Sequence, residues 1–257
     1  MAIYQLKENQ KECLRELFAK LDDSLIISCI QNYFGDAWVD DAASPKSGQI
    51  ICGDFCFLAG VPNRELVENL PEKYYDGFMI MIPDDAAWYP LIREAYGDAC
   101  KQSERYALEK EGDIFDRELL RSYIKCILPE YTVKLFEEKE YHLAMANEWS
   151  RDFCSNFRDY AHYQECGLGV AVWHGDEMVA GASSYTSYRE GMEIEIVTRE
   201  DYRRRGLALA SGAAIILAAL ERGLYPNWDA QNMMSVGTAQ KLGYHYKGPY
   251  TIFEVTA

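Results

Sequence analysis

Three consecutive arginines at residues 203–205 are followed directly by Gly206. They lie between an apolar run at 192–198 that predicts a strand and another at 206–222 that predicts a helix. The first amides of a helix have no intrahelical partner, and the helix dipole adds roughly half a positive charge there. Glycine lets an anion approach the backbone, and the arginines add cations. The junction therefore predicts a phosphate-binding loop, with an exposed basic turn as the alternative.

Two glutamates, Glu193 and Glu195, lie two residues apart within the same predicted strand. Alternate side chains of a strand project from one face, so the two carboxylates share a face. A carboxylate beside a reacting amine can accept its proton, which makes these residues candidate general bases. The alternative is a solvent-facing polar stripe on an ordinary amphipathic strand.

Composition argues against several classes of protein. The 257 residues include 26 Lys+Arg, 41 Asp+Glu and 49% apolar residues, the balance of a globular protein with a buried core. A net charge of −15 repels phosphate backbones, so we expect no nucleic-acid partner. The charged first residues differ from a signal peptide, and no apolar run reaches the ~20 residues that span a bilayer. We therefore expect a cytoplasmic protein with no membrane partner.

The eight cysteines are scattered and form no paired C-x-x-C motif. The nearest two, Cys52 and Cys56, lie in an apolar run at 49–58 that predicts a strand. A metal site would need further ligands nearby, and the four histidines show no matching spacing. The sequence therefore predicts buried free thiols and no metal.

A domain boundary is expected at residues 128/129, where a predicted helix ends before Pro129. Residues 1–128 carry most of the acidic excess and have the pattern of a mixed α/β unit. No catalytic grouping stands out in this unit, so it is expected to line the substrate side or to be a degenerate copy of the fold that follows. The predicted helices are 9–21, 88–96 and 116–127, and the predicted strands are 25–30, 37–39, 49–58 and 77–82.

Residues 129–257 are expected to form a second domain with a clearer pattern. A glycine in the polar turn 174–177 predicts a hairpin, and Gly223 predicts the end of the long helix. The order of predicted elements is β-α-α-β-β-β-α-β-α-β. The strands are 131–135, 167–173, 178–185, 192–198, 224–228 and 250–255, and the helices are 138–153, 157–164, 206–222 and 235–242.

Neither a P-loop motif nor the G-x-G-x-x-G of a dinucleotide fold is present. Instead, Arg203-Arg-Arg-Gly206-Leu-Ala208 resembles the [Q/R]-x-x-G-x-[G/A] loop of GNAT-superfamily N-acetyltransferases, which holds the pyrophosphate of acetyl-CoA. Residues 198–203 are similar to the V-x-P-x-Y-R lead-in of that family, with Thr and Glu at the Val and Pro positions. Residues 232–244 are similar to its N-x-x-A/S…K-L-G-F segment. The order of elements also matches, and the chain looks like a largely uncharacterised bacterial GNAT subgroup.

The resemblance implies an α/β (α+β) fold, with a GNAT domain of mixed, mostly antiparallel sheet at 129–257 after a second α/β unit. Pantetheine would lie in a V-shaped opening between strands 192–198 and 224–228, with the pyrophosphate on the amides of 204–208. Asn232 and Ser235 would face the pantetheine arm or the thiol, or else cap the helix that follows. The implied cofactor-binding residues are Ile196, Val197, Thr198, Arg203, Arg204, Arg205, Gly206, Leu207, Ala208, Asn232 and Ser235.

The resemblance also implies acetyl transfer to a primary amine of a small molecule or an exposed amino group, by direct attack. Glu193 or Glu195 is the expected base, although the family's frequent base position falls on Met192, so that a β-bulge would be needed to turn a glutamate inward. The usual tyrosine acid is replaced by Ala239, which leaves Ser235, Tyr244 or water.

Two other functions remain open from the sequence: a non-catalytic acyl-CoA-binding or sensing module with the same fold, and a structural, partner-binding protein. Ala239 favours the sensing module, whereas the paired glutamates favour the enzyme. The acidic first half would attract a cationic amine. The sequence leaves the acceptor and the oligomeric state undetermined, with a homodimer as one option.

Overall fold

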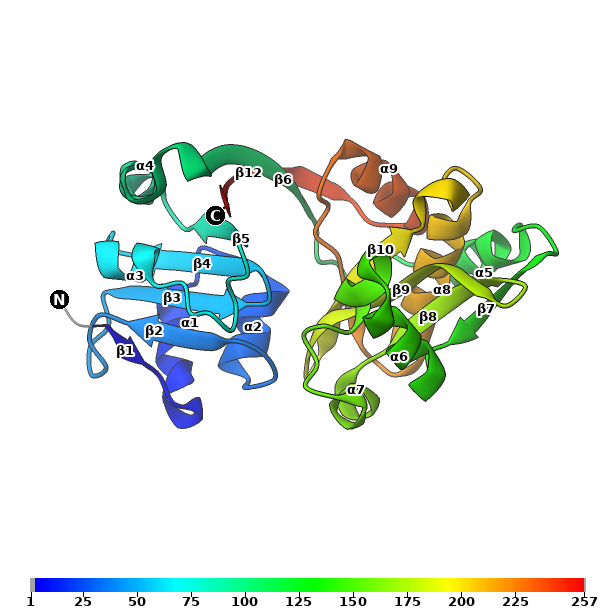
Figure 1. The fold of residues 1–257 in the computed structure, drawn as a ribbon, viewed down its shortest axis with the longest axis horizontal. Helices are drawn as coiled ribbons and strands as arrows, with labels where there is room; N and C mark the ends of the chain where they lie inside the picture. Colours follow the sequence, from blue (N-terminus) through cyan, green and yellow to red (C-terminus); the bar gives the residue numbers. More distant parts are fainter. Residues whose placement is uncertain (1–2, 257) are drawn as a thin grey trace. The chain divides into compact units, whose positions relative to one another are not determined.

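The computed structural model describes residues 3–256, which form two compact units (Figure 1). Unit 1 contains the chain up to Arg105 and the segment from Pro249 onward, and unit 2 is Tyr106–Gly248. Both units combine helices with a mostly antiparallel sheet that includes a parallel pair of strands. The predicted α/β class with mixed sheets is therefore confirmed.

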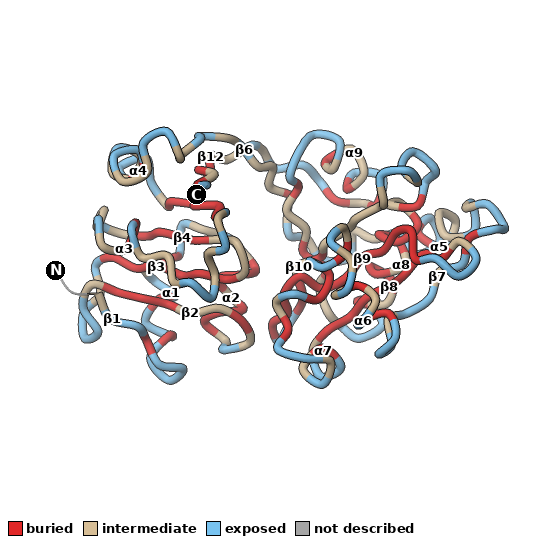
Figure 2. The backbone as a smooth tube through the Cα atoms, viewed as in Figure 1, coloured by how far each residue is buried: buried red, intermediate tan, exposed pale blue. Residues whose placement is uncertain are grey.

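The sheet of unit 1 has the strand order β1-β2-β3-β4-β5-β12-β6. Its core contains the fully buried side chains of Met81, Trp88 and Phe253, and Figure 2 shows β3 and β4 as mainly buried. The elements, with η for a 3-10 helix, are β1 (Tyr4–Gln5), η1 (Glu8–Cys13), α1 (Leu14–Leu17), α2 (Ser24–Ile30), β2 (Asp36–Val39), β3 (Ser47–Cys52), β4 (Phe55–Gly60), α3 (Arg64–Glu68), β5 (Phe78–Pro83), η2 (Ala86–Trp88), α4 (Tyr89–Tyr96) and η3 (Gly97–Ala99).

Three predictions for unit 1 need correction. Residues 25–30 are helical in α2, because Asp23 caps its first turn by accepting a hydrogen bond from Leu25 N at 2.8 Å. Since α2 is buried nearly all round, it lacks the polar spacing that reveals a helix. The run at 49–58 is a hairpin of β3 and β4 that turns at Gly53 (φ +60°). The helix predicted at 9–21 begins as η1, and α1 ends at Leu17.

The five-stranded sheet of unit 2 has the order β11-β10-β9-β8-β7, and the apolar side of β10 packs against α8. No helix among the described residues is long and apolar enough to cross a membrane. The elements are α5 (Arg117–Lys125), β7 (Tyr131–Leu135), α6 (Glu138–Ala146), η4 (Glu148–Phe153), α7 (Tyr160–Cys166), β8 (Gly169–His174), β9 (Glu177–Tyr188), β10 (Gly191–Thr198), η5 (Glu200–Tyr202), α8 (Leu207–Glu221), β11 (Tyr225–Asn227) and α9 (Met233–Leu242).

Strands β6 (Cys100–Leu108) and β12 (Tyr246–Thr256) each carry the chain from one unit into the other, so the units do not follow the expected boundary at 128/129. Residues 106–128 belong to unit 2, because Leu120 of α5 is buried in a cluster with Ala213 of α8 and Leu242 of α9. The end of β12 returns to unit 1, where Phe253 pairs with Met81 of β5.

Apart from α5 and the short 3-10 helices η2, η3 and η5, the order of elements is the same in the two halves of the chain. The first runs β1, η1/α1, α2, β2, β3, β4, α3, β5, α4, β6, and the second runs β7, α6, η4/α7, β8, β9, β10, α8, β11, α9, β12. In each half the fourth strand pairs in parallel with the fifth, as β4 with β5 and β10 with β11.

Candidate active site

The parallel pairing of β10 with β11 ends after Glu193, which lies opposite Asn227. From Ile194 to Thr198, β10 keeps β9 on one side, and no described strand pairs with its other edge. The Glu193 carboxylate accepts a hydrogen bond from Asp229 N at 2.8 Å, which holds the chain after β11 beside the point of divergence. We call this divergence the fork. The edge of β10 beyond it can pair with an extended ligand.

The loop between β10 and α8 ends at a helix terminus that no side chain of the described residues caps. Gly206 is the N-cap of α8 with φ +80°, a left-handed conformation that glycine adopts without strain. Apart from its chain neighbours, no heavy atom of the described chain lies within 4 Å of the position that a Cβ atom at Gly206 would occupy. Because α8 runs for 15 residues, its first amides and its dipole favour an anion in this open space.

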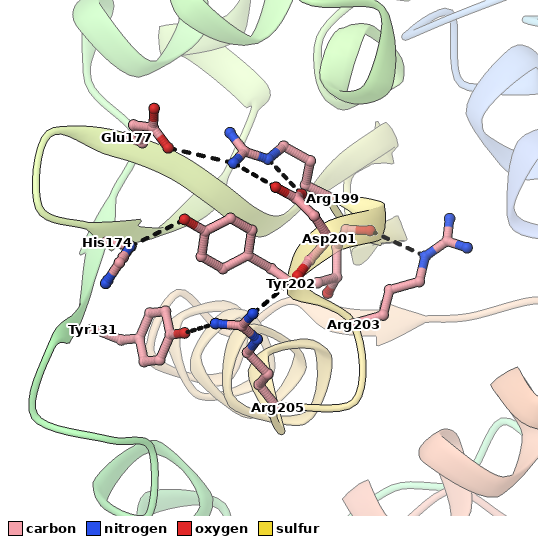
Figure 3. A network of polar contacts seen from close by, with 9 residues as sticks. Tyr131, His174, Glu177, Arg199, Asp201, Tyr202, Arg203 and Arg205 are labelled. Carbon is pink, nitrogen blue, oxygen red and sulfur yellow. Dashed lines mark hydrogen bonds and ion pairs between the residues drawn. The ribbon is translucent and has the colours of Figure 1, made fainter.

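Tyr202 anchors this loop to the sheet (Figure 3). Its ring lies between two guanidinium groups, with the Cζ atoms of Arg199 and Arg205 at 4.6 Å and 4.7 Å from the ring centre. Its hydroxyl lies 3.1 Å from Nδ1 of His174 on β8. Arg205 also donates a hydrogen bond to the hydroxyl of Tyr131 on β7 at 3.0 Å. The loop is therefore held by side-chain contacts with two strands.

The arginines of the loop differ in what they contact. Arg205 donates a second hydrogen bond, to the Asp201 carbonyl at 3.1 Å, and Arg203 donates to the Thr198 carbonyl at 3.5 Å. Arg204 has a left-handed backbone (φ +62°), and its exposed side chain has no hydrogen bond or ion pair with any other described residue. Arg204 is thus the arginine most available to an anion.

Glu193 and Glu195 lie on the sheet face opposite α8, because Met192 and Ile194, which alternate with them along β10, are buried against that helix. A register shift does occur here, between Glu193 and Ile194. The extra residue is Tyr185 on β9, so β10 keeps its strict alternation. The bulge expected from the sequence is therefore on the neighbouring strand and rotates neither glutamate. Glu193 lies beside the fork without such a rotation, because its carboxylate accepts the hydrogen bond from Asp229 N there.

The predicted site residues in and after helix α9 differ in whether their side chains are available to a ligand. Asn232 is the N-cap, and its Oδ1 accepts a hydrogen bond from Ser235 N at 3.0 Å, which is the capping alternative. Ser235 is half-buried in the first turn. Ala239 is fully buried against α8. Tyr244 is buried, its hydroxyl donates to the Pro226 carbonyl at 2.6 Å, and burial raises the pKa of that hydroxyl, so Tyr244 is unsuited to act as the acid.

The family model described as GNAT acetyltransferase matches residues 15–253. The chain belongs to the GNAT acetyltransferase family. It is 39% identical to a GCN5-related N-acetyltransferase-like protein from Streptococcus suis 89/1591, whose crystal structure aligns over 96% of this chain and 98% of that one, with a TM-score of 0.90. It is 26% identical over 231 residues, 85% of each chain, to the uncharacterised N-acetyltransferase YdfB of Bacillus subtilis (strain 168). A tandem GNAT protein from the clavulanic acid biosynthesis pathway shares the fold at 9% identity, with a TM-score of 0.57 over 99% of this chain and 98% of that one.

The predicted family and the predicted enzyme class, a GNAT-type N-acetyltransferase, are therefore confirmed. The residues of this GNAT chain fit the acetyl-CoA that the family generally uses. One sign of this fit is the open space at Gly206. Another is the Oγ1 atom of Thr198 at the end of the β10 edge, which is buried and has no hydrogen-bond partner among the described residues. Ile196 and Val197 lie along that edge, and Leu207 begins α8.

Tyr131 and His174 could not be recognised from the sequence as partners of the loop, because they lie 74 and 28 residues from the residues they contact. The sequence feature that could have indicated them is Tyr202 in the GNAT lead-in motif, since a tyrosine in a basic loop needs other side chains to pack against.

All eight cysteines are free, with Cys29, Cys52, Cys56 and Cys154 buried and Cys13 and Cys126 exposed. Burial raises the pKa of the Cys56 thiol to about 12. The described residues contain no group of three or more His, Cys, Asp or Glu that could hold a metal ion.

Proposed function

We propose that unit 2 binds acetyl-CoA at the fork and transfers its acetyl group to a primary amine of a small molecule or to an exposed amino group. The observation that carries the proposal is the uncapped start of α8 beside the open space at Gly206, directly after the unpaired edge of β10. Bound acetyl-CoA would supply an activated thioester. The first amides of α8, including that of Ala208, and the Arg204 guanidinium would bind its pyrophosphate. Backbone groups of residues 196–198 would pair with the pantetheine arm.

Proton transfer would rest on the residues around the fork. Glu193 or Glu195, on the face away from α8, takes the proton that the amine loses as the C–N bond forms. The C–S bond would break, and the departing sulfur would receive a proton from water, either directly or through the Ser235 hydroxyl, which would take a proton back from water. Ala239 has no hydroxyl to offer, and the hydroxyl of Tyr244 is bonded to Pro226.

The test combines cofactor binding with turnover. Purified protein is mixed with acetyl-CoA and a panel of primary amines, free thiol is measured, and thermal unfolding is recorded with and without CoA. Gly206→Asn tolerates the left-handed backbone but places a side chain in the open space, so the CoA-induced rise in Tm should be lost.

Gly223→Asn is the matched control, because Gly223 follows the other end of α8 with φ +73° and equally open surroundings. It should keep the full rise in Tm. An unchanged CoA effect in folded Gly206→Asn would reject the loop as the cofactor site.

The second candidate is a non-catalytic acyl-CoA-binding module, and the buried Ala239 favours it. This candidate predicts that CoA raises the Tm through Gly206 while no amine of the panel releases thiol. Thiol release that depends on both the amine and Gly206 would exclude it.

We also propose that unit 1 is a second copy of the fold whose fork is closed. Its β4 pairs with β5 from Phe55 to Leu58, and the contact continues because Asp84 N donates to the Leu58 carbonyl at 2.8 Å and Asp84 Oδ2 accepts from Gly60 N at 3.2 Å. Asn63 caps the five-residue α3, where Glu65 adds negative charge to the first turn. The capped, acidic first turn of α3 disfavours the binding of a phosphate there. The similarity in fold to a tandem GNAT protein supports the view that the GNAT fold is repeated in this chain.

The closed fork predicts one CoA per chain. Isothermal titration should give a stoichiometry of one, and Gly206→Asn should abolish all of the binding heat. Two sites per chain, or a residual site in Gly206→Asn, would contradict this view of unit 1.

A further inference from the structure

We infer that Thr186, Glu193 and Asn227 form the subsite that receives the ammonium group of the acceptor. This inference rests on the proposed function, which sets acetyl transfer at the same fork. Thr186 lies opposite Glu193 on β9, and Asn227 lies opposite Glu193 on β11. Neighbouring strands are about 5 Å apart, and directly opposite residues project from one face. The three side chains therefore form a row across the last paired position before the fork, on the face away from α8.

Asn227 has a fixed orientation that leaves one oxygen without a donor. Its side chain is 3% exposed, and its Nδ2 donates to the Tyr188 hydroxyl at 2.8 Å and to the Met192 carbonyl at 3.2 Å. A carbonyl only accepts hydrogen bonds, so the amide nitrogen must be on this side. Oδ1 is buried on the other side of the amide with no hydrogen-bond partner among the described residues.

Thr186 carries a second orphan oxygen in the same row. The residue is fully buried, and its Oγ1 has no hydrogen-bond partner among the described residues. Buried polar atoms are rarely left unpaired in native proteins, because the lost hydration is not replaced. Two such oxygens, one on each side of Glu193, indicate a group that arrives with hydrogen-bond donors.

A primary ammonium group matches this set. It carries three N–H donors and no acceptor, and the row offers the Thr186 hydroxyl, the Asn227 amide oxygen and the Glu193 carboxylate. The hydrogen bond from Asp229 N to Glu193 Oε1 at 2.8 Å fixes the carboxylate beside the fork. Its negative charge favours the cation on arrival, and the same carboxylate can then accept a proton from the amine.

The test uses the smallest cations that differ in N–H donors. With CoA present and ionic strength matched, methylammonium should raise the Tm of the wild-type protein, whereas tetramethylammonium, which has no N–H, should not. Thr186→Val removes only the orphan oxygen, so it should stay folded and lose the methylammonium effect. Thr186→Ser restores the hydroxyl and should regain it.

Thr132→Val is the matched control, because it makes the same substitution at an exposed position of β7, at the edge of the sheet away from the fork. It should keep the methylammonium effect. With the panel amine that is acetylated fastest, Thr186→Val should raise KM roughly tenfold, the loss expected for one charge-assisted hydrogen bond, and leave the affinity for CoA unchanged.

Three results would overturn the subsite while the cofactor site stands. These are equal effects of the two cations, a methylammonium effect that survives Thr186→Val, and no methylammonium effect in wild-type protein that CoA still stabilises. The last two are expected if the orphan oxygens bind only ordered water. If CoA itself does not raise the Tm, the proposed function fails and the subsite fails with it.

Discussion

At the scale of single residues, neighbours in the basic loop have separate tasks. Arg205 is bound to Tyr131 and packs on Tyr202, so it positions the loop, whereas Arg204 extends from it without a partner among the described residues. Arg204 also holds a left-handed backbone, which a non-glycine residue adopts at some cost. The contacts of Tyr202 and Arg205 hold the loop on either side of Arg204.

Arg204→Gln is expected to weaken CoA binding roughly tenfold and to reduce its salt dependence, because a charge-assisted hydrogen bond to phosphate is lost. Its Tm without CoA should equal that of the wild-type protein. Arg205→Gln should instead lower the Tm without CoA, since it breaks the bonds to Tyr131 and Asp201. Titration with CoA and thermal unfolding of both variants check the assignment, and a reversed pattern would exchange the two roles.

Single substitutions can also distinguish the roles of Glu193 and Glu195. If Glu193 is the base, Glu193→Gln should lower turnover by roughly 10²–10⁴-fold and leave CoA binding intact. Glutamine still offers an oxygen to Asp229 N, so the Tm should hold, whereas Glu193→Ala should lower both turnover and Tm. Glu195→Gln is the control and should stay within a few-fold of the wild-type rate. A large loss in Glu195→Gln alone would move the base to that residue.

At the scale of elements, the first turn of α8 is available to a ligand, whereas α9 mainly packs against the core. Helix α8 presents an uncapped first turn, and its later turns pack on the sheet and on α9. Helix α9 caps its own first turn with Asn232 and buries Ala239. The position where the family usually has a tyrosine acid is therefore part of the core between the two helices.

Ala239→Tyr is expected to fail as a gain of function. A phenol ring at a fully buried alanine overpacks the core and should lower the free energy of unfolding by about 1–3 kcal/mol or more. Urea unfolding measures this loss, and thiol release with the best amine measures the rate. Gln240→Tyr, at the exposed neighbouring position, is the control and should leave stability unchanged. A stable Ala239→Tyr with faster turnover would contradict the packing argument.

At the scale of the whole molecule, the last strand makes the core of unit 1 depend on the end of the chain. Phe253 and Val255 of β12 are fully buried in the core of unit 1, and the centres of the Phe253 and Tyr89 rings are 5.0 Å apart. All of the proposed cofactor residues are in unit 2. Stability of unit 1 and binding of CoA are thus expected to respond to different substitutions.

Phe253→Ala should lower the free energy of unfolding of unit 1 by about 3–5 kcal/mol, the usual cost of removing a buried aromatic ring. CoA should still bind with near wild-type affinity. Calorimetry follows the unfolding of the units, and titration gives the affinity. Glu254→Ala, which removes only a partly exposed ion pair with Lys101, should change stability little. Parallel losses of stability and CoA affinity in Phe253→Ala would show that the units act as one.

The sequence by itself determined the basic loop, the order of elements in the second half and the family. These three features rest on local patterns, which are set by residues close together in the chain. In the basic loop, for example, Gly206 follows three arginines and precedes an apolar helix. The local pattern was less reliable where a capping residue decides between helix and strand. In α2 the apolar residues have the pattern of a strand, and only the cap at Asp23 indicates a helix.

Only the tertiary structure decided the rest, because it depends on residues far apart in sequence. The pairing of strands places Thr186 and Asn227 on either side of Glu193. It also places the bulge at Tyr185 of β9, and not on β10. Pairing with β5 took the end of β12 into unit 1, although the sequence before it belongs to unit 2. A run of residues records its own periodicity but not its partner, so the strands that meet at the fork could be found only after the chain was folded.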